Sequence, residues 1–232
     1  MKHSRKYIEA KSKVEQRLYS IKQAIELLKS ISYAKFDETV ELNIKLGIDP
    51  KKSDQMIRGA VVLPCGTGLP KRVLVIASGE KIKEAEEAKA DYFGGEELID
   101  KIAGGWMEFD AMVATPDVMK SVAKLGKLLG PRGLMPNPKV GTVTFDVAKA
   151  VAELKAGKVE FRTDKTGSLN VPIGKLSFSV DSLVENFKAL MEAVIKAKPA
   201  TAKGKYIKKV YLCSTMSPGV EIDLSSIESK AA

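Results

Sequence analysis

Histidine and cysteine are almost absent from this chain of 232 residues, which has one histidine and two cysteines. A Ser-His-Asp triad, a Cys-His dyad or an H-E-x-x-H zinc site would have to be built around His3 alone. Cys65 and Cys213 have no C-x-x-C spacing, and two cysteines do not make a disulfide framework. We expect both to be small core residues. The sequence therefore argues against histidine or thiol catalysis, and we expect no catalytic residue and no metal site.

Long apolar runs are missing as well. The longest aliphatic stretches, such as residues 73–77, fall far short of the roughly 18 residues that a membrane span needs. The first 13 residues carry five lysines and arginines with no apolar segment behind them. Glu9 and Glu15 are atypical of a transit peptide. We therefore expect a cytoplasmic protein with no membrane partner.

Basic residues are concentrated in the two ends of the chain. Residues 1–66 hold 13 Lys and Arg against 8 Asp and Glu, residues 158–232 hold 12 against 8, and residues 67–157 hold 13 of each. This split is expected if both ends fold into one basic domain and the neutral middle is an insertion. Clustered cations release counterions when they meet phosphate, so a basic face suits nucleic acid. The net charge of +9 also has a simpler explanation, which is solubility.

The first end of the chain shows an α+β pattern. Ser20 and Gln23 form a capping box ahead of apolar positions at helical spacing, which predicts a helix over residues 21–31. Residues 39–46 alternate apolar and polar side chains, which predicts a half-buried strand. Residues 59–63 predict another short strand.

The second end repeats this pattern. The turn residues Asp164 and Gly167 predict a hairpin that pairs residues 159–162 with residues 169–171. A long helix over residues 183–195 and strands over residues 206–213 and 220–224 follow.

The middle of the chain alternates strands and helices, which is typical of a parallel sheet covered on both faces. Two prolines and two glycines within residues 64–70 mark its first boundary. Two chain crossings, near residues 66 and 157, would make a hinge. The expected strands cover residues 73–77, 92–93 and 109–114, and the expected helices cover residues 80–90, 96–103, 116–129 and 146–156.

The common phosphate-binding loops are absent from this middle part. The segment Ser78-Gly79-Glu80-Lys81 stands where a dinucleotide-binding domain has G-x-G-x-x-G, and Glu80 places negative charge where phosphate would sit. No Gly-Lys pair is followed by Ser or Thr, so there is no Walker A loop. We expect no cofactor. An α/β enzyme acting on a small phosphorylated ligand stays an alternative, as does an RNA chaperone without a fixed site.

Residues 130–139 form the most unusual stretch, with three prolines, two glycines, Arg132 and Lys139. They predict a stiff exposed loop with a basic rim. A connector with no binding role explains the same residues.

Residues 130–139, continued by Gly141-Thr142-Val143, resemble the signature of the family of the first protein of the large ribosomal subunit, in its bacterial form. The resemblance implies an α/β fold in which both termini, residues 1–66 and 158–232, form a split α+β domain. That domain carries an inserted Rossmann-like, three-layer α/β domain, residues 67–157. Further blocks resemble the family in family order at residues 35–41, 47–50, 88–95, 114–117, 161–167 and 215–216.

The resemblance implies a ribosomal protein and not an enzyme. Members of the family bind 23S rRNA, form the mobile stalk and help deacylated tRNA to leave the exit site. Many repress translation of their own operon by binding an mRNA mimic of the rRNA site. The implied partners are therefore 23S rRNA, exit-site tRNA and the protein's own operon mRNA, for a monomer off the ribosome that works on cytoplasmic ribosomes.

The family's RNA contacts, carried over by motif, fall on positions in the two ends of the chain. Where the family usually has glycine after Thr-Met, this chain has Ser217, which bears on how closely an RNA backbone approaches. The positions are Glu26, Lys35, Phe36, Thr39, Asp164, Lys165, Thr166, Lys175, Ser177, Thr215, Met216 and Ser217.

Most of these residues also have a purely structural interpretation. The Phe36 ring either stacks on a base or packs in the core. The lysines either meet phosphate or stay on a solvated face, and the hydroxyls either meet ribose or belong to strands and turns. Glu26 and Asp164 either accept hydrogen bonds from RNA, or orient neighbouring lysines, or are simply a helix-face residue and a turn residue.

Overall fold

The computed structural model describes residues 4–202 and 204–224, and the chain divides into two compact units. One unit joins the chain up to Gly68 to the chain from Val159 onward, and the other unit holds Leu69–Lys158. The division falls two residues beyond residue 66 because Thr67 is buried and Gly68 lies against the side chains of Lys175 and Phe178. His3, the single histidine, lies outside the described residues.

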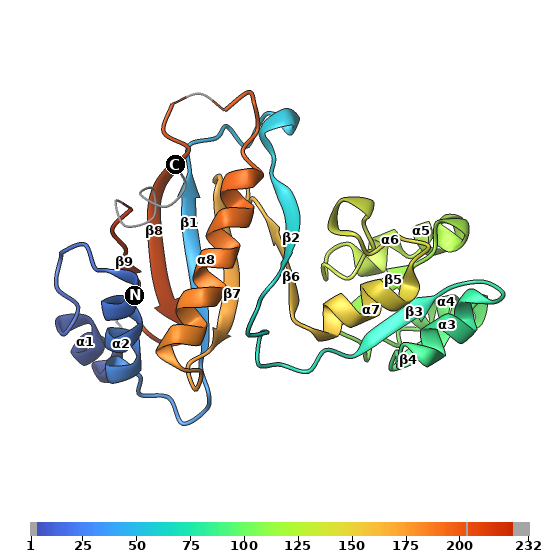
Figure 1. Ribbon diagram of the computed structural model, residues 1–232, viewed down its shortest axis with the longest axis horizontal. Coiled ribbons are helices and arrows are strands. Elements are labelled where there is room, and N and C mark those ends of the chain that lie inside the picture. Colours follow the sequence, from blue (N-terminus) through green and yellow to red (C-terminus); the bar gives the residue numbers. More distant parts are fainter. Residues whose placement is uncertain (1–3, 203, 225–232) are drawn as a thin grey trace. The chain divides into compact units, whose positions relative to one another are not determined.

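We call the first of these units the basic unit (Figure 1). Its strands β7, β1, β8 and β9 form one sheet in that order, and β2 pairs with β6. Its helices are α1 (Arg5–Ser12), α2 (Ile21–Ile31) and α8 (Val180–Lys196), with a 3-10 turn η1 (Ser53–Gln55), and its strands are β1 (Thr39–Leu46), β2 (Arg58–Val62), β6 (Lys158–Arg162), β7 (Ser168–Lys175), β8 (Ile207–Ser214) and β9 (Val220–Glu221).

Helix α2 and strand β1 have the bounds that the sequence predicts. The capping box of α2 is present, with the Ser20 amide donating to Gln23 Oε1 at 3.4 Å. Along β1 every second side chain is buried and the others are half-buried, so one face of the sheet packs on the core. Helices α2 and α8 cover that face (Figure 1). Helix α1 is not predicted by its periodicity, since Ala10 is its only buried residue, and the Ser4 hydroxyl caps it.

The predicted hairpin is wrong beyond its turn. The turn itself forms, because the Asp164 amide donates to Ser168 O at 2.9 Å. Past the turn, however, β7 pairs antiparallel with β1, and β6 pairs with β2 in another sheet. The alternating strand β1, more than 100 residues away in the sequence, therefore takes the position next to β7 that a local hairpin would give to β6.

The middle unit has three layers. Strand β3 is buried along its whole length, with Leu74 and Ile76 in one apolar core and Val73 and Val75 in another, so both faces of the sheet are covered by helices. Strands β4 and β5 flank β3 and run parallel to it. The fold-class prediction is confirmed. The strands are β3 (Val73–Ile76), β4 (Tyr92–Gly94) and β5 (Ala111–Ala114), and the helices are α3 (Lys81–Glu87), α4 (Glu96–Ala103), η2 (Pro116–Val118), α5 (Met119–Ala123), α6 (Gly126–Leu129), η3 (Pro138–Val140) and α7 (Val147–Lys155).

The loop over residues 130–139 is only partly exposed, unlike the predicted loop. Leu134 and Met135 pack against an apolar core of the middle unit, and Pro136 is buried. Cys65 and Cys213 also differ from expectation, because both are half-buried rather than core residues.

Candidate nucleic-acid interface

Eight of the predicted RNA-binding residues gather at one end of the main sheet of the basic unit. Strand β1 begins there, and β7 and β8 end there (Figure 1). Thr39 is paired with Lys175, and Val40 with Ser214. We call these residues the sheet-end cluster, and they are Lys35, Phe36, Thr39, Lys175, Ser177, Thr215, Met216 and Ser217.

Hydrogen bonds tie three separate chain segments into this cluster. The Thr39 amide donates to Thr215 Oγ1 at 3.0 Å, and Lys175 Nζ donates to Thr39 Oγ1 at 2.9 Å. Asp37 accepts from the Ser177 amide at 3.1 Å and from the Ser177 hydroxyl at 2.7 Å. Five of the six polar residues of the sheet-end cluster therefore have side-chain hydrogen bonds within the protein, and they shape the surface as well as facing any ligand.

Glu38 is the central residue of the network, although sequence reasoning passed over it. Its side chain is 1% exposed and accepts from the Ser32 hydroxyl at 2.7 Å, the Ser214 hydroxyl at 2.6 Å and the Met216 amide at 3.0 Å. Burial alone would raise the pKa of the Glu38 carboxyl, but these hydrogen bonds outweigh burial and lower the pKa. The sequence gives only one hint of this role, which is that Glu38 is a polar residue directly before the alternating strand β1.

Two apolar side chains are exposed on this polar framework. Phe36 is 57% exposed, which rules out the core-packing interpretation of its ring. Met216 is 45% exposed, and its carbonyl accepts from the Tyr33 hydroxyl at 2.9 Å. An exposed ring on a loop fixed by Asp37 and Glu38 suits stacking on an unpaired base.

Ser217 fits its turn without strain. Lys89 is the one non-glycine residue with a positive φ in the described part of the chain, so the backbone at Ser217 does not require glycine. The Ser217 hydroxyl accepts from the Ser214 amide at 2.8 Å and so closes the turn after β8. The serine thus stabilises the loop that carries Met216.

Asp164, Lys165 and Thr166 do not join the sheet-end cluster. They lie in the turn before β7, at the end of β1 where Lys45 pairs with Ser168. Six residues of strand at about 3.4 Å each separate the two ends of β1 by about 20 Å. The predicted residues therefore form two groups at opposite ends of one sheet.

The Asp164 carboxylate is engaged by its own turn. Its Oδ1 accepts from the amides of Thr166 and Ser168, both at 2.8 Å, and from the Thr166 hydroxyl at 2.7 Å. The Ser168 amide is the main cause of the lowered pKa of the Asp164 carboxyl. Of the three residues, Lys165 is the one whose side chain is exposed without a described partner. Glu26, also exposed, lies in the middle of α2, about 9 Å along the helix from Ser32.

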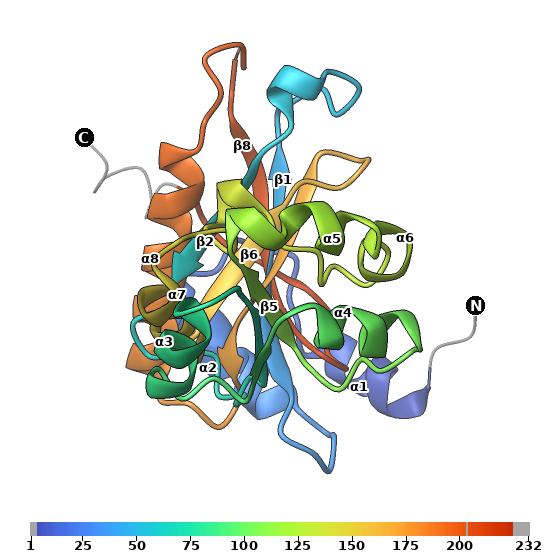
Figure 2. The ribbon, with the colours of Figure 1, turned by 90° about the vertical axis from the view of Figure 1, so that its right-hand side faces the viewer.

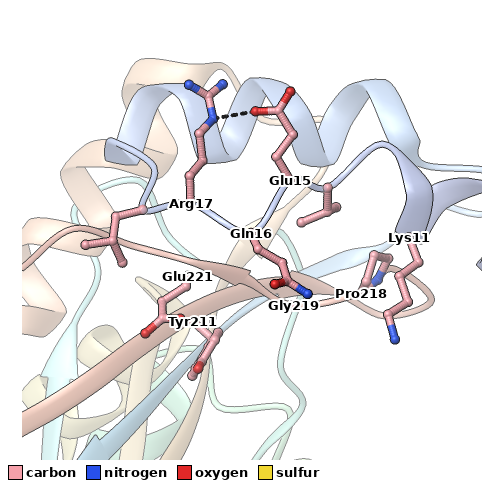
Figure 3. A pocket seen from close by; sticks show the side chains of 10 residues that line it. Lys11, Glu15, Gln16, Arg17, Tyr211, Pro218, Gly219 and Glu221 are labelled. Carbon is pink, nitrogen blue, oxygen red and sulfur yellow. Dashed lines mark ion pairs between the residues drawn. The ribbon is translucent and has the colours of Figure 1, made fainter.

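A cavity of about 480 Å³ lies beside the turn that follows Ser217 (Figure 3). Its cations are balanced by acids, since Arg17 pairs with Glu15 at 2.9 Å, and Glu221 lies opposite. The Arg17 guanidinium also stacks over the Tyr19 ring, 4.7 Å from its centre. This balance of charge makes the cavity a poor site for a polyanion. No feature of the sequence predicted that N-terminal residues within 11–18 form one wall of this cavity.

Other kinds of site have little support in the described part of the chain. Among residues 4–202 and 204–224, no group of three or more His, Cys, Asp and Glu side chains is arranged to hold a metal ion. Within the same residues, no helix is both long and apolar enough to cross a bilayer.

Comparison with known proteins identifies relatives over nearly the whole chain. A model of the ribosomal protein L1p/L10e family matches residues 28–218. This range includes both groups of predicted residues but not Glu26. The large ribosomal subunit protein uL1 of Solibacter usitatus (strain Ellin6076) is 60% identical over 232 residues, which cover 100% of this chain and 98% of that protein.

Proposed function

Because the chain belongs to the ribosomal protein L1p/L10e family, we propose that its sheet-end cluster holds a folded element of 23S rRNA at the mobile stalk. As a ribosomal protein of the large subunit it binds rRNA, works on the cytoplasmic ribosome and is not an enzyme. The observation that carries the proposal is the exposed Phe36 ring on a loop fixed by the buried Glu38 carboxylate. Lys35, the residue before Phe36 in the sequence, adds an exposed cation for a phosphate.

The same proposal extends to tRNA. The basic unit stays on the rRNA, while the middle unit assists the release of deacylated tRNA from the exit site. Two chain crossings, at Gly68 and Val159, connect the units covalently, which suits a part that moves on a fixed base.

A site that holds a folded RNA will also hold an mRNA with the same fold. We include repression of the protein's own operon by such an mRNA mimic in the proposal. Off the ribosome, the protein acts as a monomer.

The central test is a competition between RNAs at equal salt. The protein should bind 23S rRNA more tightly than a scrambled RNA of the same length, because shape and unpaired bases supply specificity beyond phosphate contacts. Equal affinity for both RNAs would contradict the proposal and favour an unspecific chaperone.

The Phe36→Ala variant tests the ring itself. Loss of one stacked base should weaken binding to 23S rRNA by about 1 to 3 kcal/mol and leave the thermal unfolding transition in place, since the ring is exposed. Phe145→Ala is the matched control, because Phe145 is also 57% exposed but lies in the middle unit. An rRNA titration that is the same for both variants would remove Phe36 from the interface.

A further inference from the structure

Tyr33 links two of the loops that carry the sheet-end cluster. It lies in residues 32–38, the segment that connects α2 to β1 and projects beyond the start of β1 (Figure 2). Its hydroxyl donates to the carbonyl oxygen of Met216 at 2.9 Å, and Met216 lies in the turn after β8, 183 residues away in the sequence. The Tyr33 ring is half-buried and packs against the apolar core of the basic unit. The core therefore holds the ring, and the hydroxyl restrains the turn.

Both polar atoms of the Met216 backbone have partners within the protein. The Met216 amide donates to Glu38 Oε2 at 3.0 Å, and the Met216 carbonyl accepts from Tyr33. The neighbouring Ser217 hydroxyl accepts from the Ser214 amide at 2.8 Å and closes the turn. The Met216 side chain, by contrast, is 45% exposed. The side chain is therefore the part of Met216 that is free to contact a ligand.

The two contacts that hold Met216 differ in what they stabilise. Glu38 is buried and accepts several hydrogen bonds, so its loss affects the fold. The hydrogen bond from Tyr33 lies at the surface, where water replaces a lost donor, so it contributes little to folding. Its effect is on the freedom of the turn. A methionine side chain has three rotatable bonds, and a mobile backbone beneath it adds to the conformational entropy that binding removes.

We propose that Tyr33 is a positioning residue for RNA recognition. Its hydroxyl fixes the turn after β8 so that the Met216 side chain packs against a ribose or a base of the bound RNA. The inference rests on the proposed rRNA function, and it adds a residue that is not among the positions carried over from the family.

A double-mutant cycle on rRNA affinity tests this role. Tyr33→Phe removes the hydroxyl and keeps the ring that packs on the core, and Met216→Ala removes the exposed side chain. The matched control is Tyr211→Phe, because Tyr211 is also half-buried in the basic unit and its hydroxyl accepts from Lys209, outside the sheet-end cluster. Each variant is titrated with purified 23S rRNA at the same salt concentration, and its thermal unfolding is recorded.

Tyr33→Phe should bind 23S rRNA about 3- to 10-fold more weakly, because binding must then order a loosened turn. Its unfolding transition should stay close to that of wild type. In the Met216→Ala background, Tyr33→Phe should cause no further loss of affinity, since the side chain that it positions is gone. Tyr211→Phe should bind as wild type does.

A second measurement follows the Met216 methyl group by NMR in the free protein. With isotope-labelled methionine methyl groups, the signal that disappears in Met216→Ala belongs to Met216. In Tyr33→Phe this signal should move toward the averaged position of a mobile methionine. If Tyr33 only stabilised the fold, the signal would keep its wild-type position in the folded variant, and the inference would be wrong.

Equal affinity of Tyr33→Phe and Tyr211→Phe for 23S rRNA would overturn the inference. A loss of affinity that is the same with and without the Met216 side chain would also overturn it, because the Tyr33 hydroxyl would then contact RNA itself. Both results leave the proposed function standing, since wild type would still prefer 23S rRNA to a scrambled RNA. A wild-type protein without that preference contradicts the proposed function, whatever Tyr33 does.

Discussion

Single residues in the segment from Lys35 to Thr39 have opposite roles. Glu38 directs its carboxylate into the protein, onto Ser32 and Ser214, and the exposed Asp37 directs its carboxylate onto Ser177. Phe36, directly before them, is turned out to solvent. A buried carboxylate is tolerated only when its oxygens are fully hydrogen-bonded, as those of Glu38 are. The exposed ring therefore depends on a buried charge for its position.

Glu38→Gln should destabilise the protein by about 1 to 3 kcal/mol at pH 7, because an amide nitrogen replaces one acceptor in a set of donors. Since the folded pKa of Glu38 is lowered, the stabilisation from its charge is present above the unfolded value of about 4.3 and is lost as the pH falls through the folded pKa. The difference in the free energy of unfolding between wild type and Glu38→Gln should therefore become smaller as the pH falls. Urea unfolding between pH 7 and pH 3 measures it.

Glu41→Gln is the control for this experiment, since Glu41 lies on the half-exposed face of the same strand. It should change stability little at any pH. A Glu38→Gln variant with the stability of Glu41→Gln would show that the Glu38 network does not stabilise the loop.

At the scale of elements, a short turn can form as the sequence predicts while the strands on either side take distant partners. Asp164 and Gly167 make the expected turn, and Gly167 has a φ of +76°, which suits glycine. Strand β7 nevertheless pairs with β1 over Thr39 to Lys45. The turn therefore serves as a corner between two sheets rather than as the tip of a hairpin.

Two substitutions separate the structural role of Asp164 from RNA recognition. Asp164→Ala should cost about 1 to 2 kcal/mol of stability, because the amides of Thr166 and Ser168 lose their acceptor. Asp164→Asn keeps an acceptor oxygen and should retain both stability and rRNA affinity. Thermal unfolding and rRNA titration measure the two effects.

Asp54→Ala, at an exposed acid of the neighbouring loop, is the control and should leave stability unchanged. If Asp164→Asn is as stable as wild type but binds rRNA much more weakly, the charge of Asp164 contacts RNA directly.

At the scale of the whole molecule, the two units have separate apolar cores. The core of the basic unit draws on residues from both ends of the chain, including Leu63 and Val159 beside the crossings. The two cores of the middle unit draw only on residues between Val73 and Leu154. Each unit therefore contains what it needs to bury its own apolar surface.

Deletion of Val73–Ala156, with the ends rejoined, should leave a folded basic unit that keeps most of the affinity for 23S rRNA. The excess positive charge lies outside the deleted segment, which has 13 acids against 11 bases. A cooperative thermal transition shows whether the variant is folded, and titration with rRNA gives its affinity. A folded deletion variant that no longer binds would place the RNA site in the middle unit.

Local patterns in the sequence were sufficient to predict α2, β1 and the layers of the middle unit, because helix caps and hydrophobic periodicity depend on residues a few positions apart. The concentration of positive charge in the two ends of the chain can likewise be found by counting basic and acidic residues in the sequence. Other features depend on contacts between distant parts of the chain: the partner of β7, the burial of Glu38 and the distance between Asp164 and Phe36. Whether a particular side chain is buried or exposed depends on what folds against it, and those partners can lie far away in the sequence, as Met216 lies 178 residues from Glu38.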